Sequence, residues 1–163
     1  MPRKLLAISG ILALLLAMPP GYADYLFVSN ERSNTVTVLD PDTLKIVETI
    51  PTGGRPRGMV VSPNDELVYV AAGVAGQIDV IDVDKLKVVR SLDSGPDPEL
   101  LDIAPTGKRL YIANENNAKV TVMNANSGEV LAQIPVGVEP EGIAVKPDNS
   151  ITVATAETTS MVH

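Results

Sequence analysis

Two charged positions recur in this sequence at an interval of 42 residues. The six residues that occupy them are Arg55, Arg57, Asp97, Glu99, Glu139 and Glu141. They vary in type inside a repeated loop, and loop residues held by a rigid scaffold often contact ligands. These six side chains are therefore the candidate ligand contacts of the sequence, and ordinary solvated loop charge is the alternative explanation.

Other groups that could do chemistry are few. The sequence has no Cys and no Trp, and its single His is the last residue, His163. A nucleophile activated by a neighbouring base, or a metal site with several His ligands, cannot be assembled from these residues. We therefore expect no enzyme activity, no catalytic residues and no metal site, and we predict no cofactor.

Carboxylates and amides also recur near predicted turns. The carboxylates are Asp40, Asp42, Asp82 and Asp84, and the amides with their neighbouring glutamates are Asn30, Glu31, Asn114 and Glu115. Aspartate and asparagine in turns commonly hydrogen-bond to their own backbone. Turn formation is thus favoured over metal binding for the first set, and the second set is given little functional weight.

The candidate contacts belong to a longer repeat. The motif Gly-x-x-Pro, followed by six residues and another Pro, appears as GGRPRGMVVSP, GPDPELLDIAP and GVEPEGIAVKP, starting at Gly53, Gly95 and Gly137. Each unit contains four short β-rich runs separated by turn residues. A period in the low forties with four strands per unit predicts β-propeller blades, since helical repeats of that length would show a 3.6-residue apolar spacing.

One run in each unit alternates apolar and polar residues. In TVTVLD, QIDVID and KVTVMN, valine and isoleucine alternate with Thr37, Asp79 and Thr121. Alternation with a period of two is typical of a strand with one buried face. We therefore expect these three polar side chains to face polar surroundings.

The repeat resembles a known family. The segment YIAN, Tyr111 to Asn114, together with GMVVSPNDE and GIAVKPDN, is similar to the YVTN family of propeller repeats, and the similarity covers residues 25 to 162. The resemblance implies an all-β propeller of four-stranded antiparallel blades. It also implies that GMVVSP, LLDIAP and GIAVKP are the innermost strands and line a central channel.

The repeated Gly and Pro residues then have structural roles. Gly-x-x-Pro would connect the outer strand of one blade to the inner strand of the next, with Gly tolerating the reversal and Pro fixing the entry to the strand. The closing Pro63, Pro105 and Pro147 would begin the turn after each inner strand. The six charged residues would surround one mouth of the channel, where we expect a protein or small-molecule ligand to bind.

The blades do not make a complete ring in this reading. The predicted blade parts are 25–52, 57–95, 99–137 and 141–163, of which the first lacks an inner strand and the last stops within its third strand. We therefore expect a partial propeller of three to four blades. The remaining blades would come from a longer chain or from a second copy, and a truncated product without function is the alternative.

The beginning of the chain predicts export. Arg3 and Lys4 precede an apolar run from Leu5 to Met18, and PPGYA follows, so residues 1–23 are a predicted signal peptide. The apolar run would span about 21 Å of a hydrocarbon core of about 30 Å, so no stable membrane anchor is expected after cleavage. We predict a periplasmic protein, residues 24–163, without disulfides.

The predicted mature chain is acidic. Without Arg3 and Lys4, 11 basic residues stand against 20 acidic ones, a formal charge of −9. Phosphate backbones require clustered Lys and Arg, and no run of basic residues here is longer than two. Nucleic acid is therefore excluded as a partner.

Two further resemblances bear on function. The final segment ATAETTSMVH, Ala154 to His163, is similar to the corresponding blade of β-propeller proteins associated with pyrroloquinoline-quinone-dependent catabolism. This implies a binding or scaffold module that serves quinoprotein alcohol oxidation in the periplasm. The repeats also resemble the d-type haem propeller of nitrite reductase, which implies a redox protein as the alternative.

Overall fold

The computed structural model describes residues 24–163, which form an all-β structure with one short 3-10 helix, η1 (Glu115–Asn117). The predicted signal peptide, residues 1–23, lies outside the described residues. Within residues 24–163, no helix has the length and apolar character needed to cross a bilayer.

The strands form four antiparallel sheets. The first contains β1 (Leu26–Asn30), β2 (Thr35–Leu39) and β3 (Ile46–Pro51). The second contains β4 (Pro56–Val61), β5 (Leu67–Ala72), β6 (Gln77–Asp82) and β7 (Lys87–Asp93). The third contains β8 (Pro98–Ile103), β9 (Arg109–Asn114), β10 (Lys119–Asn124) and β11 (Val130–Pro135). The fourth contains β12 (Pro140–Val145), β13 (Thr152–Ala156) and β14 (Met161–Val162).

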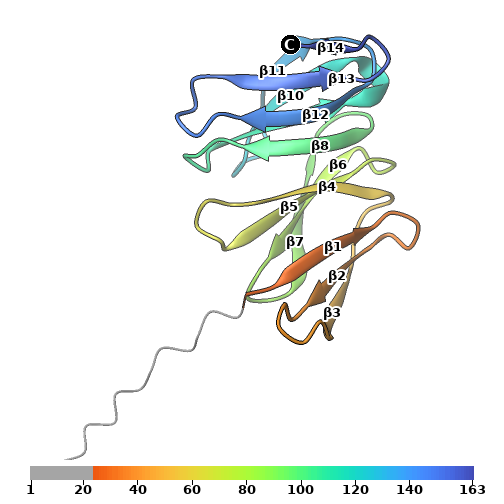
Figure 1. The fold of residues 1–163 in the computed structure, drawn as a ribbon, viewed down its shortest axis with the longest axis vertical. Coiled ribbons are helices and arrows are strands. Elements are labelled where there is room, and N and C mark those ends of the chain that lie inside the picture. Colours follow the sequence, from red (N-terminus) through yellow and green to blue (C-terminus); the bar gives the residue numbers. More distant parts are fainter. Residues whose placement is uncertain (1–23) are drawn as a thin grey trace, which may run out of the picture.

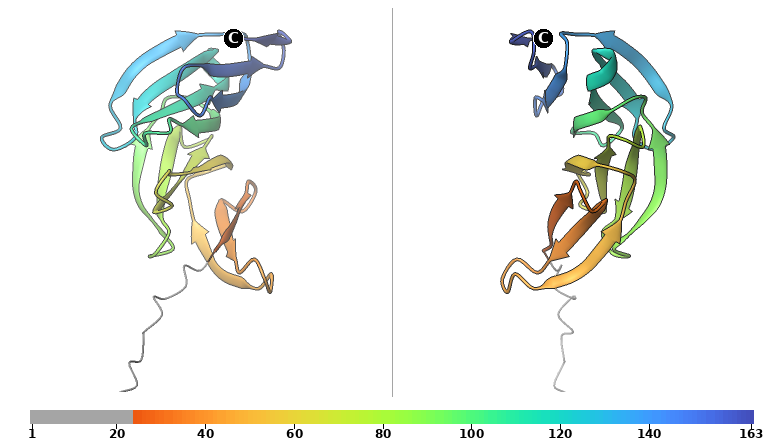
Figure 2. Two further views of the ribbon diagram at one scale, coloured as in Figure 1. Left: turned by 60° about the vertical axis from the view of Figure 1, so that its left-hand side comes forward. Right: turned by 90° about the vertical axis from the view of Figure 1, so that its right-hand side faces the viewer.

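The sheets follow one another as propeller blades along an open arc (Figure 1, Figure 2). Strands β4, β8 and β12 are neighbours in space, and the outer strands β3, β7 and β11 lie on the convex side of the arc (Figure 2). The predicted partial β-propeller is confirmed. The predicted strand order is confirmed as well, because GMVVSP, LLDIAP and GIAVKP form the inner strands.

Apolar side chains fill the spaces between the first three blades. Between the first and second blades, the buried cluster consists of Val36, Val38, Ile50, Val68, Val70 and Ile81. Between the second and third blades, it consists of Tyr69, Ala71, Ile78, Val80, Leu92, Leu101, Ile103, Leu110, Ile112, Met123 and Ala125. Alternate residues of each strand supply these contacts, as the period of two predicts.

The environment expected for the alternating polar residues is wrong at two of three positions. Asp79 is only 1% exposed and Thr121 is fully buried, whereas Thr37 is half-buried. Asp79 accepts hydrogen bonds from the backbone of Gly53 (2.6 Å) and from the Ser91 hydroxyl (2.6 Å). Strands β6 and β10 lie in the middle of complete blades, so neighbouring blades cover both of their faces, and polar side chains there must find internal partners.

The predicted turns are confirmed by their hydrogen bonds. Asp40 Oδ1 accepts the backbone N–H of Thr43 at 2.7 Å, and Asp82 Oδ1 accepts that of Lys85 at 2.9 Å. The bond from Thr43 lowers the pKa of Asp40 below its usual value. These carboxylates therefore have the structural role that the sequence predicts.

Candidate binding site at the mouth of the inner strands

The loop before each inner strand has the same anchored backbone. Arg55, Asp97 and Glu139 adopt φ values of 61°, 47° and 57°. Their carbonyl groups accept the N–H of the residue 18 positions later, which is Gly73, Glu115 and Glu157 respectively, at 2.9, 3.0 and 2.9 Å. These bonds fix each loop to the next turn of its own blade, so that successive loops present equivalent residues at one end of the inner strands.

This geometry corrects the role assigned to glycine. Gly95 has a left-handed φ of 86°, but Gly53 and Gly137 do not adopt positive φ. The reversal occurs instead at the residue before each proline. A left-handed residue other than Gly costs free energy and is often found where a side chain must be placed for a purpose.

Arg55 lies at the centre of a charged cluster that joins three blades. Its Nη1 donates to Asp97 Oδ1 at 3.0 Å, and its Nη2 donates to Glu99 Oε1 at 2.8 Å. Its Nε lies 3.3 Å from Glu31 of the first blade, and Nη2 lies 3.9 Å from Glu115. One guanidinium thus links carboxylates that come from the first and third blades.

Arg57 contacts two of the carboxylates that also contact Arg55, namely Glu99 and Glu31. Its Nε lies 2.7 Å from Glu99 Oε2, and its Nη1 lies 3.7 Å from Glu31 Oε1. Arg57 and Glu99 occupy equivalent positions of neighbouring blades, as do Arg55 and Asp97. We name the six residues Arg55, Arg57, Asp97, Glu99, Glu31 and Glu115 the mouth cluster.

Glu99 is the buried member of the mouth cluster. Its side chain is 1% exposed, compared with 11% for Asp97 and 25% for Glu115. Burial is the main cause that raises the pKa of Glu99 to about 7, assisted by a hydrogen bond with Glu115 and opposed by both arginines. Glu99, one of the six candidate ligand contacts, is therefore covered by its neighbours in the mouth cluster.

The mouth cluster has a carboxylate arrangement that resembles a metal site. Oxygen atoms of Asp97, Glu99 and Glu115 lie within 4.8 Å of one another. Arg55 approaches all three, and Asn116 Nδ2 also donates to Asp97 Oδ2 at 3.0 Å. The guanidinium supplies the positive charge that a metal ion would bring to these oxygens.

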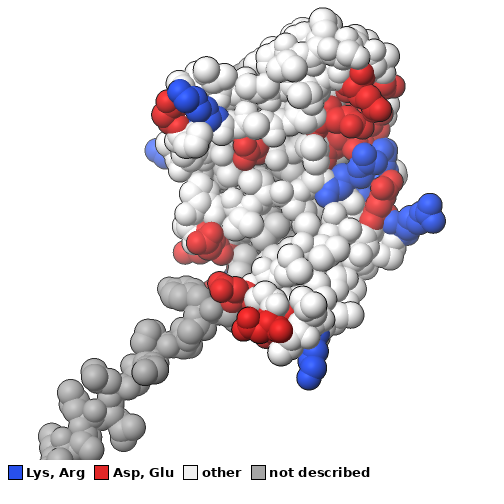
Figure 3. All heavy atoms as spheres, in the orientation of Figure 1, with Lys and Arg blue, Asp and Glu red and all other residues white. Residues whose placement is uncertain are grey.

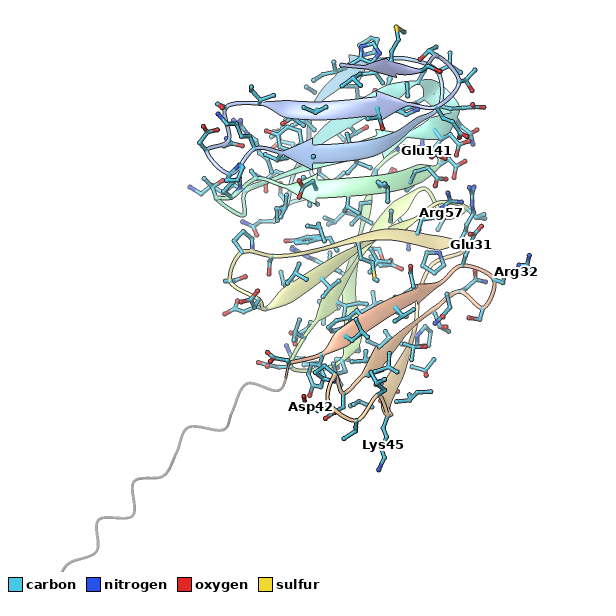
Figure 4. All side chains as sticks on the ribbon, in the orientation of Figure 1. Glu31, Arg32, Asp42, Lys45, Arg57 and Glu141 are labelled. Carbon is cyan, nitrogen blue, oxygen red and sulfur yellow. The ribbon has the colours of Figure 1, made fainter. Side chains whose placement is uncertain are left out.

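Glu139 and Glu141 are placed at the same end but are not joined to the mouth cluster. Both are half-buried, and the contacts of residues 24–163 include no ion pair for either. Figure 4 shows Glu31, Arg57 and Glu141 along one edge of the arc, while Asp42 and Lys45 lie at the far end of the first blade. In Figure 3, acidic atoms gather above the arginines on this edge.

A pocket of about 500 Å³ adjoins the mouth cluster. Its lining residues are Arg55, Gly73, Val74, Ala75, Gly76, Asp93, Gly95, Pro96, Asp97 and Asn116. The volume lies in the range that small-molecule sites occupy. The lining combines carboxylates with the apolar Val74, which is 77% exposed.

From the sequence alone, Glu31 and Glu115 are expected only in turns. The structure places both carboxylates beside the arginines, so their role was underestimated. The repeat spacing could have indicated that Glu31 and Glu115 occupy equivalent positions, because they are separated by 84 residues, twice the repeat period. Equivalent positions of a propeller repeat lie on the same face of the ring, which also holds for the six candidate contacts.

His163 and Met161, which bear on the redox alternative, lie in the fourth blade. His163 Nε2 accepts the backbone N–H of Gly137 at 2.9 Å, so its lone pair is engaged within the chain. Met161 is 45% exposed. An axial haem ligand requires a free donor atom, and the engaged Nε2 of His163 does not fit that requirement.

Solved structures with the same fold include two larger proteins. A hydrazine synthase from Kuenenia stuttgartiensis has a TM-score of 0.78 and 23% identity, with 84% of this chain and 40% of that chain covered. Dihydro-heme d1 dehydrogenase NirN in complex with DHE has a TM-score of 0.70 and 23% identity, with coverages of 88% and 33%. This chain therefore spans less than half of either structure, and the likeness shows the fold.

Sequence comparison identifies the family. No curated protein matches the chain. The model of the YNCE-like beta-propeller family matches residues 16–100 and again residues 67–149, which together cover most of the sequence. The two matches overlap, as expected for a chain built from repeats. The chain belongs to the YNCE-like beta-propeller family.

Proposed function

We propose that this protein is a non-catalytic binding module that holds a cationic partner at the mouth of its inner strands. The single observation that carries the proposal is the excess of carboxylates there. The mouth cluster has four carboxylates for two guanidiniums, and Glu139 and Glu141 add two more on the adjacent blade. A surface with this charge attracts cations and steers their approach.

The arginines are not free to hold an anion. Arg55 is paired with Asp97 and Glu99, and Arg57 with Glu99. Glu139 and Glu141 of the fourth blade have no such partner among the described residues. The adjoining pocket offers Asp93, Asp97 and exposed apolar Val74, which suits a lysine or arginine side chain with its aliphatic stem.

The biological setting that we propose is export to the periplasm and service to quinoprotein alcohol oxidation. The tripartite start of the sequence supports export. The similarity of ATAETTSMVH to propellers associated with pyrroloquinoline-quinone-dependent catabolism supports a role in quinoprotein alcohol oxidation. In this setting the partner is a protein with a basic surface, and the propeller contributes binding and no chemistry.

Binding of a defined cationic probe tests the proposal. Hexalysine should bind the purified full chain in a calorimetric titration at low salt, and binding should weaken as salt is added. The double variant E139Q/E141Q should lower the affinity about 2- to 30-fold, because two exposed charge pairs contribute about 0.2–1 kcal/mol each.

The matched control carries the same charge change at another site. D42N/E48Q removes two exposed carboxylates from the first blade and should leave hexalysine affinity unchanged. Equal loss in both double variants would show attraction by net charge alone and would contradict a site at the mouth. In cells, a photo-crosslinker at position 141, but not at position 42, should capture a component of a quinoprotein oxidation system.

A redox role is the second candidate, favoured by the likeness to the propeller of NirN. The engaged nitrogen of His163 argues against it. A Soret band in the purified full chain, supplied with haem, would favour the redox role over the binding module. An unchanged spectrum leaves the binding module as the better account.

A further inference from the structure

Glu99 is unusual among the charged residues of the mouth. It is almost completely buried, and it contacts both arginines at once through its two oxygen atoms. Its position at the start of β8 places it against the loop before β4, so it bridges the second and third blades. The binding of a cationic partner does not by itself require such a residue.

The charged groups around Glu99 come from every neighbouring element. Arg55 and Arg57 belong to the loop before β4 and to β4, Asp97 to the loop before β8, Glu115 to η1, and Glu31 to the β1–β2 turn. Glu141 has the equivalent position on β12, next to β8. Among residues 24–163, no ion pair involves its side chain. Burial and two nearby carboxylates favour the neutral acid, while two guanidiniums favour the carboxylate.

Arg55 and Arg57 differ in the carboxylate partners that remain to them when Glu99 is neutral. Arg55 retains Asp97, which accepts from Nη1 at 3.0 and 3.3 Å, and it retains Glu31 at 3.3 Å. Arg57 retains only Glu31, at 3.7 Å. Protonation therefore removes the main partner of Arg57 and only one of several partners of Arg55.

We propose that Glu99 is a proton-controlled clasp for Arg57, which is held against β8 when Glu99 is ionised and released into the mouth when Glu99 is neutral. The neutral acid can donate its proton to Glu115 in a hydrogen bond. The mouth then loses one negative charge and gains a free guanidinium. As far as it concerns ligand binding, this inference rests on the proposed function, and it predicts that a cationic partner binds more weakly after proton uptake.

The pKa of Glu99, raised by burial to about 7, places this change near neutral pH. Glu99 is thus a positioning residue that acts through Arg57. A structural ion pair without a switch would stay ionised at all pH values in which the protein is folded.

Nuclear magnetic resonance of the full chain tests the clasp without any partner. The Glu99 carboxyl carbon and the Arg57 Nε–H signal should both titrate between pH 5 and 9 with a common midpoint near 7. In E99Q the Arg57 signal should no longer depend on pH, whereas the control E48Q, which removes an exposed carboxylate from the first blade, should behave as the wild type does. A Glu99 midpoint near 4.5, or an Arg57 signal that does not follow it, overturns the clasp.

A second variant covers the case in which E99Q fails to fold. E115Q removes the carboxylate that shares the proton, and the midpoint of Glu99 should therefore fall. An unchanged midpoint in E115Q would contradict the assigned proton-sharing pair and with it the clasp.

Hexalysine binding separates this inference from the proposed function. Lysine stays charged between pH 6 and 8, so wild-type affinity should be about 2- to 5-fold lower at pH 6 than at pH 8. If the Arg57 signal follows the ionisation of Glu99 but hexalysine does not bind at any pH, the clasp is supported and the proposed cationic partner is refuted. Equal hexalysine affinity at pH 6 and pH 8 would support the cationic partner and overturn the proposed regulation by Glu99.

Discussion

The two junctions on either side of the third blade have the same geometry and opposite electrostatics. Across the first, between β4 and β8, equivalent positions carry Arg55 and Asp97, and Arg57 and Glu99, which form ion pairs. Across the second, between β8 and β12, the same positions are all acidic. The 42-residue repeat therefore decides which positions meet, while residue type decides whether ion pairs join the blades there.

The first junction also has larger buried apolar side chains than the fourth blade brings to the second junction. The cluster between the second and third blades contains large side chains such as Tyr69, Ile112 and Met123. The fourth blade contributes Ala154 and Ala156 to the buried apolar residues. Asp102 Oδ2 accepts the backbone N–H of Val145 at 2.7 Å, which gives the second junction a polar link away from the mouth. We therefore expect the second junction to open more readily than the first.

The largest expected effect is in the core of the first junction. I112A should lower the free energy of unfolding by about 3 kcal/mol, because a fully buried isoleucine leaves a cavity when truncated. Denaturant unfolding measures this change. The control is I134A on β11, where the side chain is 49% exposed and the loss should stay below about 1 kcal/mol. Similar losses in both variants would remove the contrast between the junctions.

Removal of the central guanidinium should have the next largest effect. R55A leaves Glu99 and Asp97 without their shared partner and should lower the free energy of unfolding by about 2 kcal/mol. The control variant R32A removes an exposed arginine from the neighbouring turn and should change stability by less than about 0.5 kcal/mol. An R55A protein as stable as R32A would mean that the ion pairs do not stabilise the first junction.

Stability should fall as pH rises through the range in which Glu99 ionises. The folded pKa, about 7, is higher than the ordinary value of 4.5, so the folded state binds more protons between these values. The stabilising contribution is complete below about pH 4.5 and is lost as pH approaches and passes 7. The wild type should lose on the order of 2 kcal/mol over this window relative to E99Q. Parallel pH profiles of the two proteins would contradict the raised pKa.

The smallest effect should come from making the second junction resemble the first. E139R/E141R places arginines opposite Asp97 and Glu99 and should raise the free energy of unfolding by about 0.5–1 kcal/mol. Arg55 already adopts the left-handed φ that Glu139 has, so arginine is compatible with this backbone. The control E48R adds the same residue type on an exposed strand and should have no such effect. Destabilisation by E139R/E141R would show that the acidic residues are preferred for packing.

The site could be predicted from the sequence only in part. The repeat placed Arg55, Arg57, Asp97 and Glu99 at equivalent loop positions, and the structure brings these four residues together. The same period could have drawn attention to Glu31 and Glu115. Their contact with the arginines depends on how far the turns of one blade reach toward the loop of the next, which is not a property of any single repeat.

The amino-acid sequence specified the blades, the order of their strands and the end at which the charged loops gather. It could do so because strand alternation, Gly-x-x-Pro loops and the period of 42 residues are local patterns that every unit repeats. The burial of Asp79, Glu99 and Thr121 is apparent only in the folded structure. Burial depends on the neighbouring blade that covers a residue, and the pKa of Glu99 depends on charges that other blades bring to it.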